Sequence, residues 1–153
     1  MKRIVVDANL CAGCRLCELA CSFFHEEVFS PTLSRVTVVK QDVYGLDFPV
    51  LCRQCDHCPA IDACPTNALT RTELGTIAAD IEACVGCSQC VEECTYNAVK
   101  LVSEPLICDL CEGDPQCVRR CPTKALSYEE SKPDTRRPEY VFLEMRRRWG
   151  IDG

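Results

Sequence analysis

Sixteen cysteines among 153 residues restrict what this chain can fold into more than any other feature. They fall into four groups of four, and no cysteine is left over. The groups are Cys11, Cys14, Cys17 and Cys21; Cys52, Cys55, Cys58 and Cys64; Cys84, Cys87, Cys90 and Cys94; and Cys108, Cys111, Cys117 and Cys121. A chain of this length has a thin apolar core, so cysteines at this density must help to hold the fold together.

Disulfides, zinc and iron–sulfur clusters are the three chemistries that use so many thiols. Disulfides require an oxidising compartment and a secretory leader. After Met1 come Lys2 and Arg3 and then only Ile4-Val5-Val6 before Asp7, an apolar run that is too short for a leader and predicts a first β-strand. Structural zinc sites use two cysteine pairs separated by a long spacer, whereas three of these groups hold three cysteines within seven residues. Iron–sulfur clusters are therefore the prediction, and a zinc-stabilised interaction module is the alternative of another class.

The spacing of the cysteines has a mechanical reason. Three cysteines at steps of three let a short loop surround one cubane cluster, and the helix that follows carries the fourth cysteine away. In two-cluster bacterial ferredoxins this fourth cysteine binds the other cluster, and a proline commonly follows it, as Pro65 and Pro122 do here. The sequence thus predicts four [4Fe–4S] clusters held by two reciprocal pairs of groups.

The pairing of the groups follows from the segments between them. Residues 52–100 contain short strand-like segments after Cys64 and Cys94 and a returning strand over 75–80, so they are interpreted as a complete two-cluster unit. The first and fourth groups would then form an outer unit from residues 1–51 and 101–128, with residues 21–52 and their β-like run over 35–40 as a connection. The alternative pairs group one with two and group three with four. The nested choice predicts an α+β fold of two ferredoxin-like dicluster units with four ligand sets: Cys11, Cys14, Cys17 and Cys121; Cys108, Cys111, Cys117 and Cys21; Cys52, Cys55, Cys58 and Cys94; and Cys84, Cys87, Cys90 and Cys64.

The C-terminal residues 129–153 are assigned to a linker and a helix. Residues 127–138 are polar and contain two prolines, which predicts an extended segment, and residues 139–149 predict a helix ended by Gly150. This helix either packs on the chain's own clusters or serves as a docking arm for a partner subunit.

Residues other than cysteine are assigned supporting roles. His25 and His57 lie near cysteine groups, but with every ligand position filled they are expected to be surface residues or hydrogen-bond donors near a cluster. Phe23, Phe24 and Tyr96 are expected to shield clusters from water and to fill the small core.

Arg119 and Arg120 could raise the potential of a nearby cluster, but solvent exposure is the default expectation. The sequence contains no catalytic triad, phosphate loop or dinucleotide motif, which predicts that the chain is not an enzyme by itself.

The formal net charge of −6 argues against nucleic acid as a partner and is compatible with docking on a basic surface. No apolar run reaches the length of a membrane span. Together with the expected lack of a secretory leader, this predicts a cytoplasmic location.

Several runs of the sequence resemble the four-cluster ferredoxin-like subunits of anaerobic oxidoreductases. They are CRLCELACSFFH over 14–25 with its continuation to residue 35, CRQC over 52–55, and the fourth group through the CPT of 121–123. That family includes iron–sulfur subunits of the dimethyl sulfoxide reductase superfamily, of carbon monoxide dehydrogenase–hydrogenase systems, and of tungsten-containing aldehyde oxidoreductases. The short chain and the CELACSFFH run are most similar to the last of these.

The resemblance covers residues 1 to about 128 and implies the nested pairing of groups. It also implies a large catalytic partner with a tungsten- or molybdenum-pterin site, and a flavin subunit or soluble ferredoxin as the second carrier. The alternatives are a subunit of a hydrogenase, formate or carbon monoxide dehydrogenase complex, and a free polyferredoxin. The second group departs from the family pattern, because many relatives place the long gap before the third cysteine.

Overall fold

The computed structural model describes residues 1–151, in which eight short strands form four two-stranded antiparallel sheets. The strands are β1 (Lys2–Val6), β2 (Val36–Gln41), β3 (Leu46–Leu51), β4 (Leu69–Arg71), β5 (Ile77–Ala79), β6 (Lys100–Leu101), β7 (Pro105–Leu106) and β8 (Leu126–Glu130). The helices are α1 (Leu16–Glu26), α2 (Pro59–Asp62), α3 (Gln89–Glu93), α4 (Gln116–Arg119) and α5 (Pro138–Trp149), with 3-10 turns at Ala8–Leu10, Pro31–Leu33 and Leu110–Gly113. The predicted α+β class is confirmed.

Strand β1 pairs with β8, which joins the first residues of the chain to a segment more than a hundred residues later. Val6 lies opposite Leu126 in this register, and both are buried. Beyond the strands, the Asp7 amide donates to the carbonyl of Ala125 at 2.8 Å. This pairing holds the loop of the first cysteine group beside the segment that follows Cys121. The predicted strand over residues 4–6 is confirmed.

Strands β2 and β3 form a hairpin that contributes much of the larger core. Val36, Val38, Phe48 and Val50 are buried, and Val36 pairs with Leu51 at the open end. The run over 35–40 is therefore a strand as predicted, but residues 21–52 are more than a connection. Strand β3 was not predicted because it lacks alternation: almost every residue of Leu46–Leu51 is buried.

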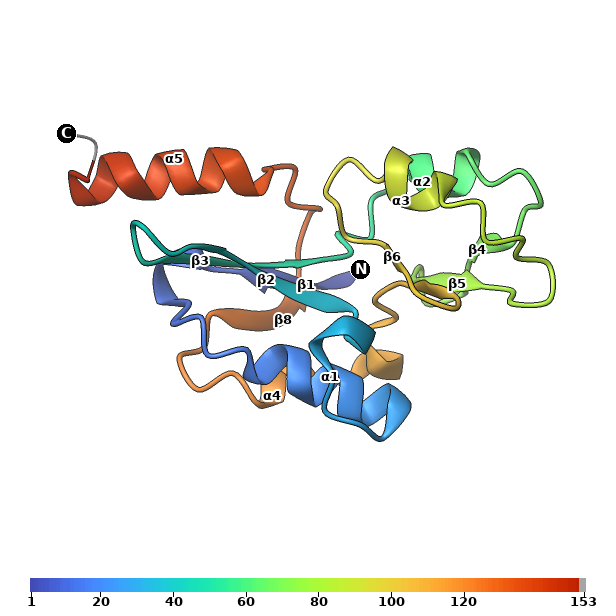
Figure 1. Ribbon diagram of the computed structural model, residues 1–153, viewed down its shortest axis with the longest axis horizontal. Helices are drawn as coiled ribbons and strands as arrows, with labels where there is room; N and C mark the ends of the chain where they lie inside the picture. The colour runs from blue at the N-terminus through green and yellow to red at the C-terminus, as the bar shows by residue number, and fades with distance from the viewer. Residues whose placement is uncertain (152–153) are drawn as a thin grey trace.

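Helix α5 explains that burial, because it covers β3 (Figure 1). Val141, Phe142 and Met145 are buried on it, and the ring of Phe142 packs edge-on against Phe48 with centroids 6.5 Å apart. Gly150 ends the helix with a φ of 65°, so the predicted helix is confirmed and packs on its own chain. The extended segment before it is shorter than predicted, since β8 continues to Glu130.

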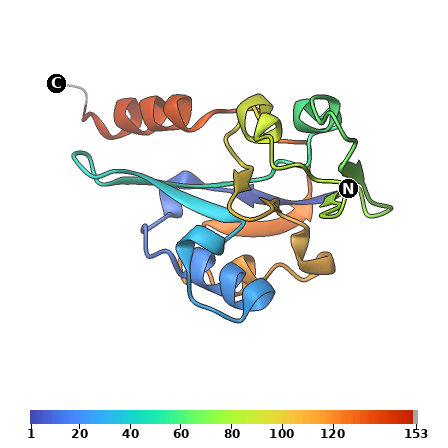
Figure 2. The same cartoon turned by 45° about the vertical axis from the view of Figure 1, so that its right-hand side comes forward.

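Figures 1 and 2 show two parts side by side. In one part, α5, the β2–β3 hairpin, the β1–β8 pair and then α1 with α4 follow one another in layers. In the other, α2 and α3 lie over β4 and β5, around a small second core that includes Ala60, Leu69, Ile77 and Val99. The short strands predicted after the second, third and fourth cysteine groups are present as β4, β6 and β8. No helix within residues 1–151 is long and apolar enough to cross a bilayer.

Candidate metal centres

The same backbone turn recurs in the four cysteine groups. The residue before the second cysteine of each group has a left-handed φ, and these residues are Gly13 (63°), Gln54 (50°), Gly86 (66°) and Leu110 (63°). A left-handed residue reverses the chain direction, so that consecutive cysteines curve around one point instead of spiralling along a helix. Glycine adopts this conformation readily, whereas Gln54 and Leu110 are held in it by nearly complete burial.

A second recurring turn lies after the last cysteine of three groups. The third residue beyond Cys64, Cys94 and Cys121 has a left-handed φ, and these residues are Asn67 (53°), Asn97 (52°) and Lys124 (59°). The turn aims the next amide back at the sulfur: Ala68 N–H donates to Cys64 Sγ at 3.2 Å, and Ala98 N–H donates to Cys94 Sγ at 3.4 Å.

The last cysteines of the first and fourth groups also receive amide donors. Cys21 Sγ accepts from the amide of Arg35 at 3.3 Å. Burial raises the pKa of Cys121, but donors from the backbone of Leu126 and from Thr123 outweigh it, and the net pKa lies below the usual value. Amide donors stabilise a thiolate, which is the form that binds metal.

Cys11, Cys14 and Cys17 line one cavity together with Cys121. Cys11 and Cys14 come from the loop before α1, Cys17 lies in the first turn of α1, and Cys121 follows α4, which packs against α1. Burial, reinforced by the neighbouring charge of Glu18, raises the pKa of Cys17 to about 12.

The part containing α2 and α3 holds two more cavities of this kind. Cys52, Cys55 and Cys58 share one with Cys94, and Cys84, Cys87 and Cys90 share the other with Cys64. Helices α2 and α3 are in contact. Each helix starts at the cysteine loop of its own group and leads to the last cysteine of that group, which lines the cavity of the other group.

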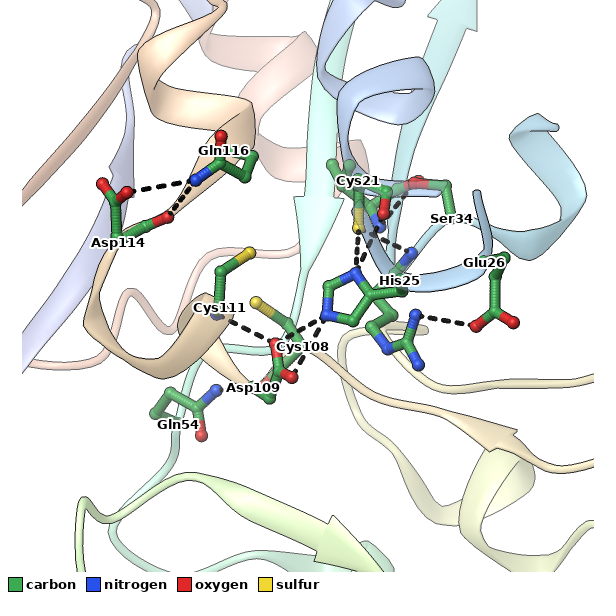
Figure 3. A network of polar contacts seen from close by, with 12 residues as sticks. Cys21, His25, Glu26, Ser34, Gln54, Cys108, Asp109, Cys111, Asp114 and Gln116 are labelled. Atoms are coloured by element: carbon green, nitrogen blue, oxygen red, sulfur yellow. Dashed lines mark hydrogen bonds and ion pairs between the residues drawn. The ribbon is translucent and has the colours of Figure 1, made fainter. Parts of the chain in front are cut away.

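The remaining four cysteines lie near one another: Cys21 is in α1, Cys117 is in α4, and Cys108 and Cys111 are in the segment before α4. Burial raises the pKa of Cys108 and of Cys117, and the nearby Cys21 adds to both effects. Burial likewise raises the pKa of Cys111 to about 11. Figure 3 shows the sulfur atoms of Cys21, Cys108 and Cys111 in one region beside the ring of His25.

His25 connects helix α1 to the segment that carries Cys108 and Cys111. Its Nδ1 lies 2.9 Å from the carbonyl oxygen of Cys21 and 3.8 Å from Cys21 Sγ, and its Nε2 lies 3.1 Å from both carboxylate oxygens of Asp109 (Figure 3). Burial opposes protonation of the ring, but Asp109 and Cys21 outweigh it and raise the pKa of His25 to about 10. His25 is thus the cation that links α1 to the loop of Cys108 and Cys111.

The sulfur ligands at these four sites fit iron–sulfur clusters. Each has three sulfur atoms from one cysteine group and one from a distant group, and a positively charged metal centre would stabilise the thiolate form of the cysteines whose pKa burial raises, such as Cys17 and Cys117. The amides aimed at sulfur stabilise that charged form.

The other residues singled out from the sequence have varied positions. His57 is exposed and pairs with Asp62 at 3.2 Å. Phe23 and Phe24 are each 49 % exposed, so the expectation that they fill the core was wrong: Cys17, Glu18, Cys21 and Ser22 occupy the buried side of α1, which leaves both rings on its exposed side.

Phe23 stacks instead on the exposed Phe29 and, with Phe24, lines an open groove between α1 and α4. Tyr96 is half-buried and lines the cavity of Cys52, as expected of a shielding residue. Arg119 and Arg120 are exposed, which is the default predicted for them.

Sequence reasoning missed a buried polar connection between the two parts. Arg3 of β1 donates twice to the main-chain oxygen of Gln54 at 3.2 Å, pairs with Asp56 at 2.8 Å and also contacts the carbonyl of Ser131. Gln54 in turn donates to the carbonyl of Cys108 at 2.7 Å. The signal in the sequence was the polar residue Gln54 inside a CxxC loop.

With this geometry established, comparison with known proteins identifies the class: the chain belongs to the family of iron–sulfur electron-transfer subunits of oxidoreductases. It is 38% identical over 122 residues to the polyferredoxin-like subunit of an aliphatic sulfonate oxidoreductase from Pyrococcus furiosus, covering 77% of this chain and 70% of that one. It is 34% identical over 176 aligned positions to the electron transport protein HydN of Escherichia coli, covering 97% of both chains. The chain is accordingly a non-catalytic electron carrier of an oxidoreductase.

A solved structure supports the same class. The active-site complex BamBC of benzoyl coenzyme A reductase contains a chain with a TM-score of 0.51 and 27% identity to this one, over 95% of this chain and 89% of that one. No protein-family model matches the chain.

Proposed function

We propose that this subunit carries four [4Fe–4S] clusters, each bound by three cysteines of one group and one cysteine of a partner group. The ligand sets are those of the nested pairing predicted from the sequence. The observation that carries the proposal is that the last cysteine of one group lines the same cavity as the first three cysteines of another group. Cys94 does so with the loop of Cys52, Cys64 with the loop of Cys84, and Cys121 with the loop of Cys11. Nothing in the local sequence of a group requires its fourth cysteine to lie there.

Two nested dicluster units follow from this proposal. Residues 52–100 form the inner unit, and residues 1–51 with 101–128 form the outer unit. The β1–β8 pair and the contact of α1 with α4 support the outer pairing, and the contact of α2 with α3 supports the inner one.

When bound, each cluster accepts and releases one electron. The protein's own contribution is to fix the thiolates, to exclude water and to direct amide and charged groups at the sulfurs. His25 and the amide of Arg35 do so at Cys21, and the amides of Ala68 and Ala98 do so at Cys64 and Cys94. Such groups set the potential of each cluster.

The proposed partner is a large catalytic subunit with a tungsten- or molybdenum-pterin site, from which electrons pass to a flavin subunit or a soluble ferredoxin. The resemblance of the CELACSFFH run to subunits of tungsten aldehyde oxidoreductases supports this choice. The relative in Pyrococcus furiosus and the BamBC chain each belong to a named oxidoreductase, which supports a subunit over a free carrier. A cytoplasmic location stays a prediction.

Anaerobic purification from the native host tests the cofactors and the partner together. Four cubane clusters predict about sixteen irons and sixteen acid-labile sulfides per chain. Tungsten or molybdenum in a co-eluting large subunit would support the proposed partner, whereas nickel would indicate a hydrogenase or carbon monoxide dehydrogenase complex. Zinc in a colourless protein would refute the clusters, and full iron without any partner would indicate a free polyferredoxin.

Single cysteine substitutions test the ligand sets. Under the nested pairing, Cys94→Ser and Cys55→Ser remove the same component of the electron paramagnetic resonance spectrum of the reduced protein, and Cys64→Ser and Cys87→Ser remove a second one. If group one paired with group two, Cys64→Ser would instead match Cys14→Ser, and the nested assignment would fail.

A further inference from the structure

We propose that Arg53 raises the reduction potential of the cluster held by Cys52, Cys55, Cys58 and Cys94 above the potential it would have without this cation, and that Asp134 partly opposes the effect. The inference rests on the proposed cluster at that site. It assigns Arg53 as a residue that favours the reduced form of this cluster.

The side chain of Arg53 is only 2 % exposed, which is exceptional for an arginine. Its Nε, Nη1 and Nη2 atoms donate no hydrogen bond within residues 1–151. A buried guanidinium keeps its charge, because arginine is not deprotonated in proteins. Its charge is therefore neither spread into water nor consumed by hydrogen bonds to the surrounding protein.

The guanidinium lies among aromatic rings at the cavity of this cluster. Arg53 directly follows Cys52 and lines the cavity together with the four cysteines and Tyr96. Its Cζ atom is 5.4 Å from the ring centre of Phe48 and 6.0 Å from that of Tyr96. Rings stabilise a cation without neutralising it, and an apolar environment lets its field act over several ångströms.

The nearest carboxylate is already engaged elsewhere. Asp134 lies 3.9 Å from Arg53 Nη1, at the limit of an ion pair, while it accepts two hydrogen bonds at 3.0 Å from the side chain of Arg136. The other buried arginine, Arg3, has closer partners: it pairs with Asp56 at 2.8 Å and donates to the main-chain oxygen of Gln54 at 3.2 Å. Among the buried arginines of residues 1–151, Arg53 is thus the weakly compensated one.

The sign of the effect follows from charge alone. One-electron reduction adds a negative charge at the cluster, and a fixed cation nearby favours the reduced form, which raises the potential. Removing Arg53 must lower the potential, and removing the carboxylate of Asp134 must raise it. A role in packing alone would not produce opposite signs.

The test is a potentiometric titration of the whole subunit, followed by electron paramagnetic resonance, with the component assigned by its loss in Cys55→Ser. At the ambient potential that half-reduces this component in the wild type, Arg53→Met is expected to lower its reduced-to-oxidised ratio at least tenfold, which is about 59 mV for one electron. Arg53→Lys, which keeps the cation, should lower the ratio less than Arg53→Met. Asp134→Asn should raise it, and the components of the other clusters should stay in place.

Equal shifts in Arg53→Met and Arg53→Lys, or a downward shift in Asp134→Asn, would overturn the inference. If Arg53→Met fails to retain iron, the signs for Arg53→Lys and Asp134→Asn still decide the matter. Iron, sulfide and the wild-type spectrum test the proposed clusters separately. A wild type with four clusters and variants without opposite shifts would reject the role of Arg53 and leave the proposed function standing.

Discussion

Gly13 and Gly86 occupy the same position in two cysteine loops, and they offer a matched test of how tightly these loops are packed. Both have a left-handed φ, 63° and 66°. A methyl group at Gly86 would meet nothing within 4 Å, whereas one at Gly13 would overlap the carboxylate of Asp47. That carboxylate accepts a hydrogen bond from Lys40 at 2.7 Å and is mostly buried, so its movement is restricted.

The expected costs follow from these environments. An alanine in the left-handed region lowers the free energy of unfolding by about 1–2 kcal/mol, and this is the whole loss expected for Gly86→Ala. Gly13→Ala carries the same cost and an overpacking cost of about 1–3 kcal/mol in addition. With a urea dependence of about 2 kcal/mol per molar, the midpoint for Gly13→Ala should lie about 0.5–1.5 M below that for Gly86→Ala.

Anaerobic urea unfolding followed by far-ultraviolet circular dichroism measures the difference, and iron per chain reports whether the loop still binds its cluster. Adding Asp47→Ala to Gly13→Ala should reduce the loss in urea midpoint caused by the alanine to about the loss seen for Gly86→Ala, because the overlap with the carboxylate is relieved. Equal midpoints for the two single variants, or no relief in the double variant, would refute the steric reasoning.

Three further predictions concern the core and the C-terminal segment. Phe142→Ala should lower the free energy of unfolding by about 3–5 kcal/mol, because the ring is buried against β3, while Tyr140→Ala, 62 % exposed on the same helix, should stay within about 0.5 kcal/mol; equal urea midpoints would contradict the packing of α5. Glu18→Ala should lower the free energy of unfolding by about 1–3 kcal/mol, and it should speed hydrogen exchange at the Val38 amide, which donates to the buried carboxylate at 2.6 Å. Glu18→Gln keeps an acceptor oxygen and should leave that amide protected. Burial raises the pKa of Asp134, but its hydrogen bonds to Arg136 outweigh this and hold the net pKa below the usual value. The ionised Asp134 therefore stabilises the fold above the unfolded pKa of about 3.9, and this contribution disappears as the pH falls through the lower folded value. The difference in unfolding free energy between wild type and Asp134→Asn should shrink between pH 5 and pH 3. A difference that grows over this range would contradict the assignment.

The sequence by itself determined the features whose contacts lie within a few residues. The spacing of the cysteines requires short turning loops, and the pairs Ala68-Leu69 and Ala98-Val99 lead into strands β4 and β6, which pair with the next strands along the chain. The strand over 77–79 and the end of the last helix at Gly150 could be predicted for the same reason, because turns and caps depend on local backbone preferences.

Only the tertiary structure decided which of the similar residues are buried. Strand β3 looks irregular in the sequence, because its outer face is covered by α5, nearly a hundred residues later. Arg53, Arg119 and Arg120 cannot be told apart by residue type, yet the first is enclosed by Phe48, Tyr96 and Asp134 and the others lie in solvent. Burial is set by contacts between distant segments, and a charge acquires its effect on a neighbouring group from that burial.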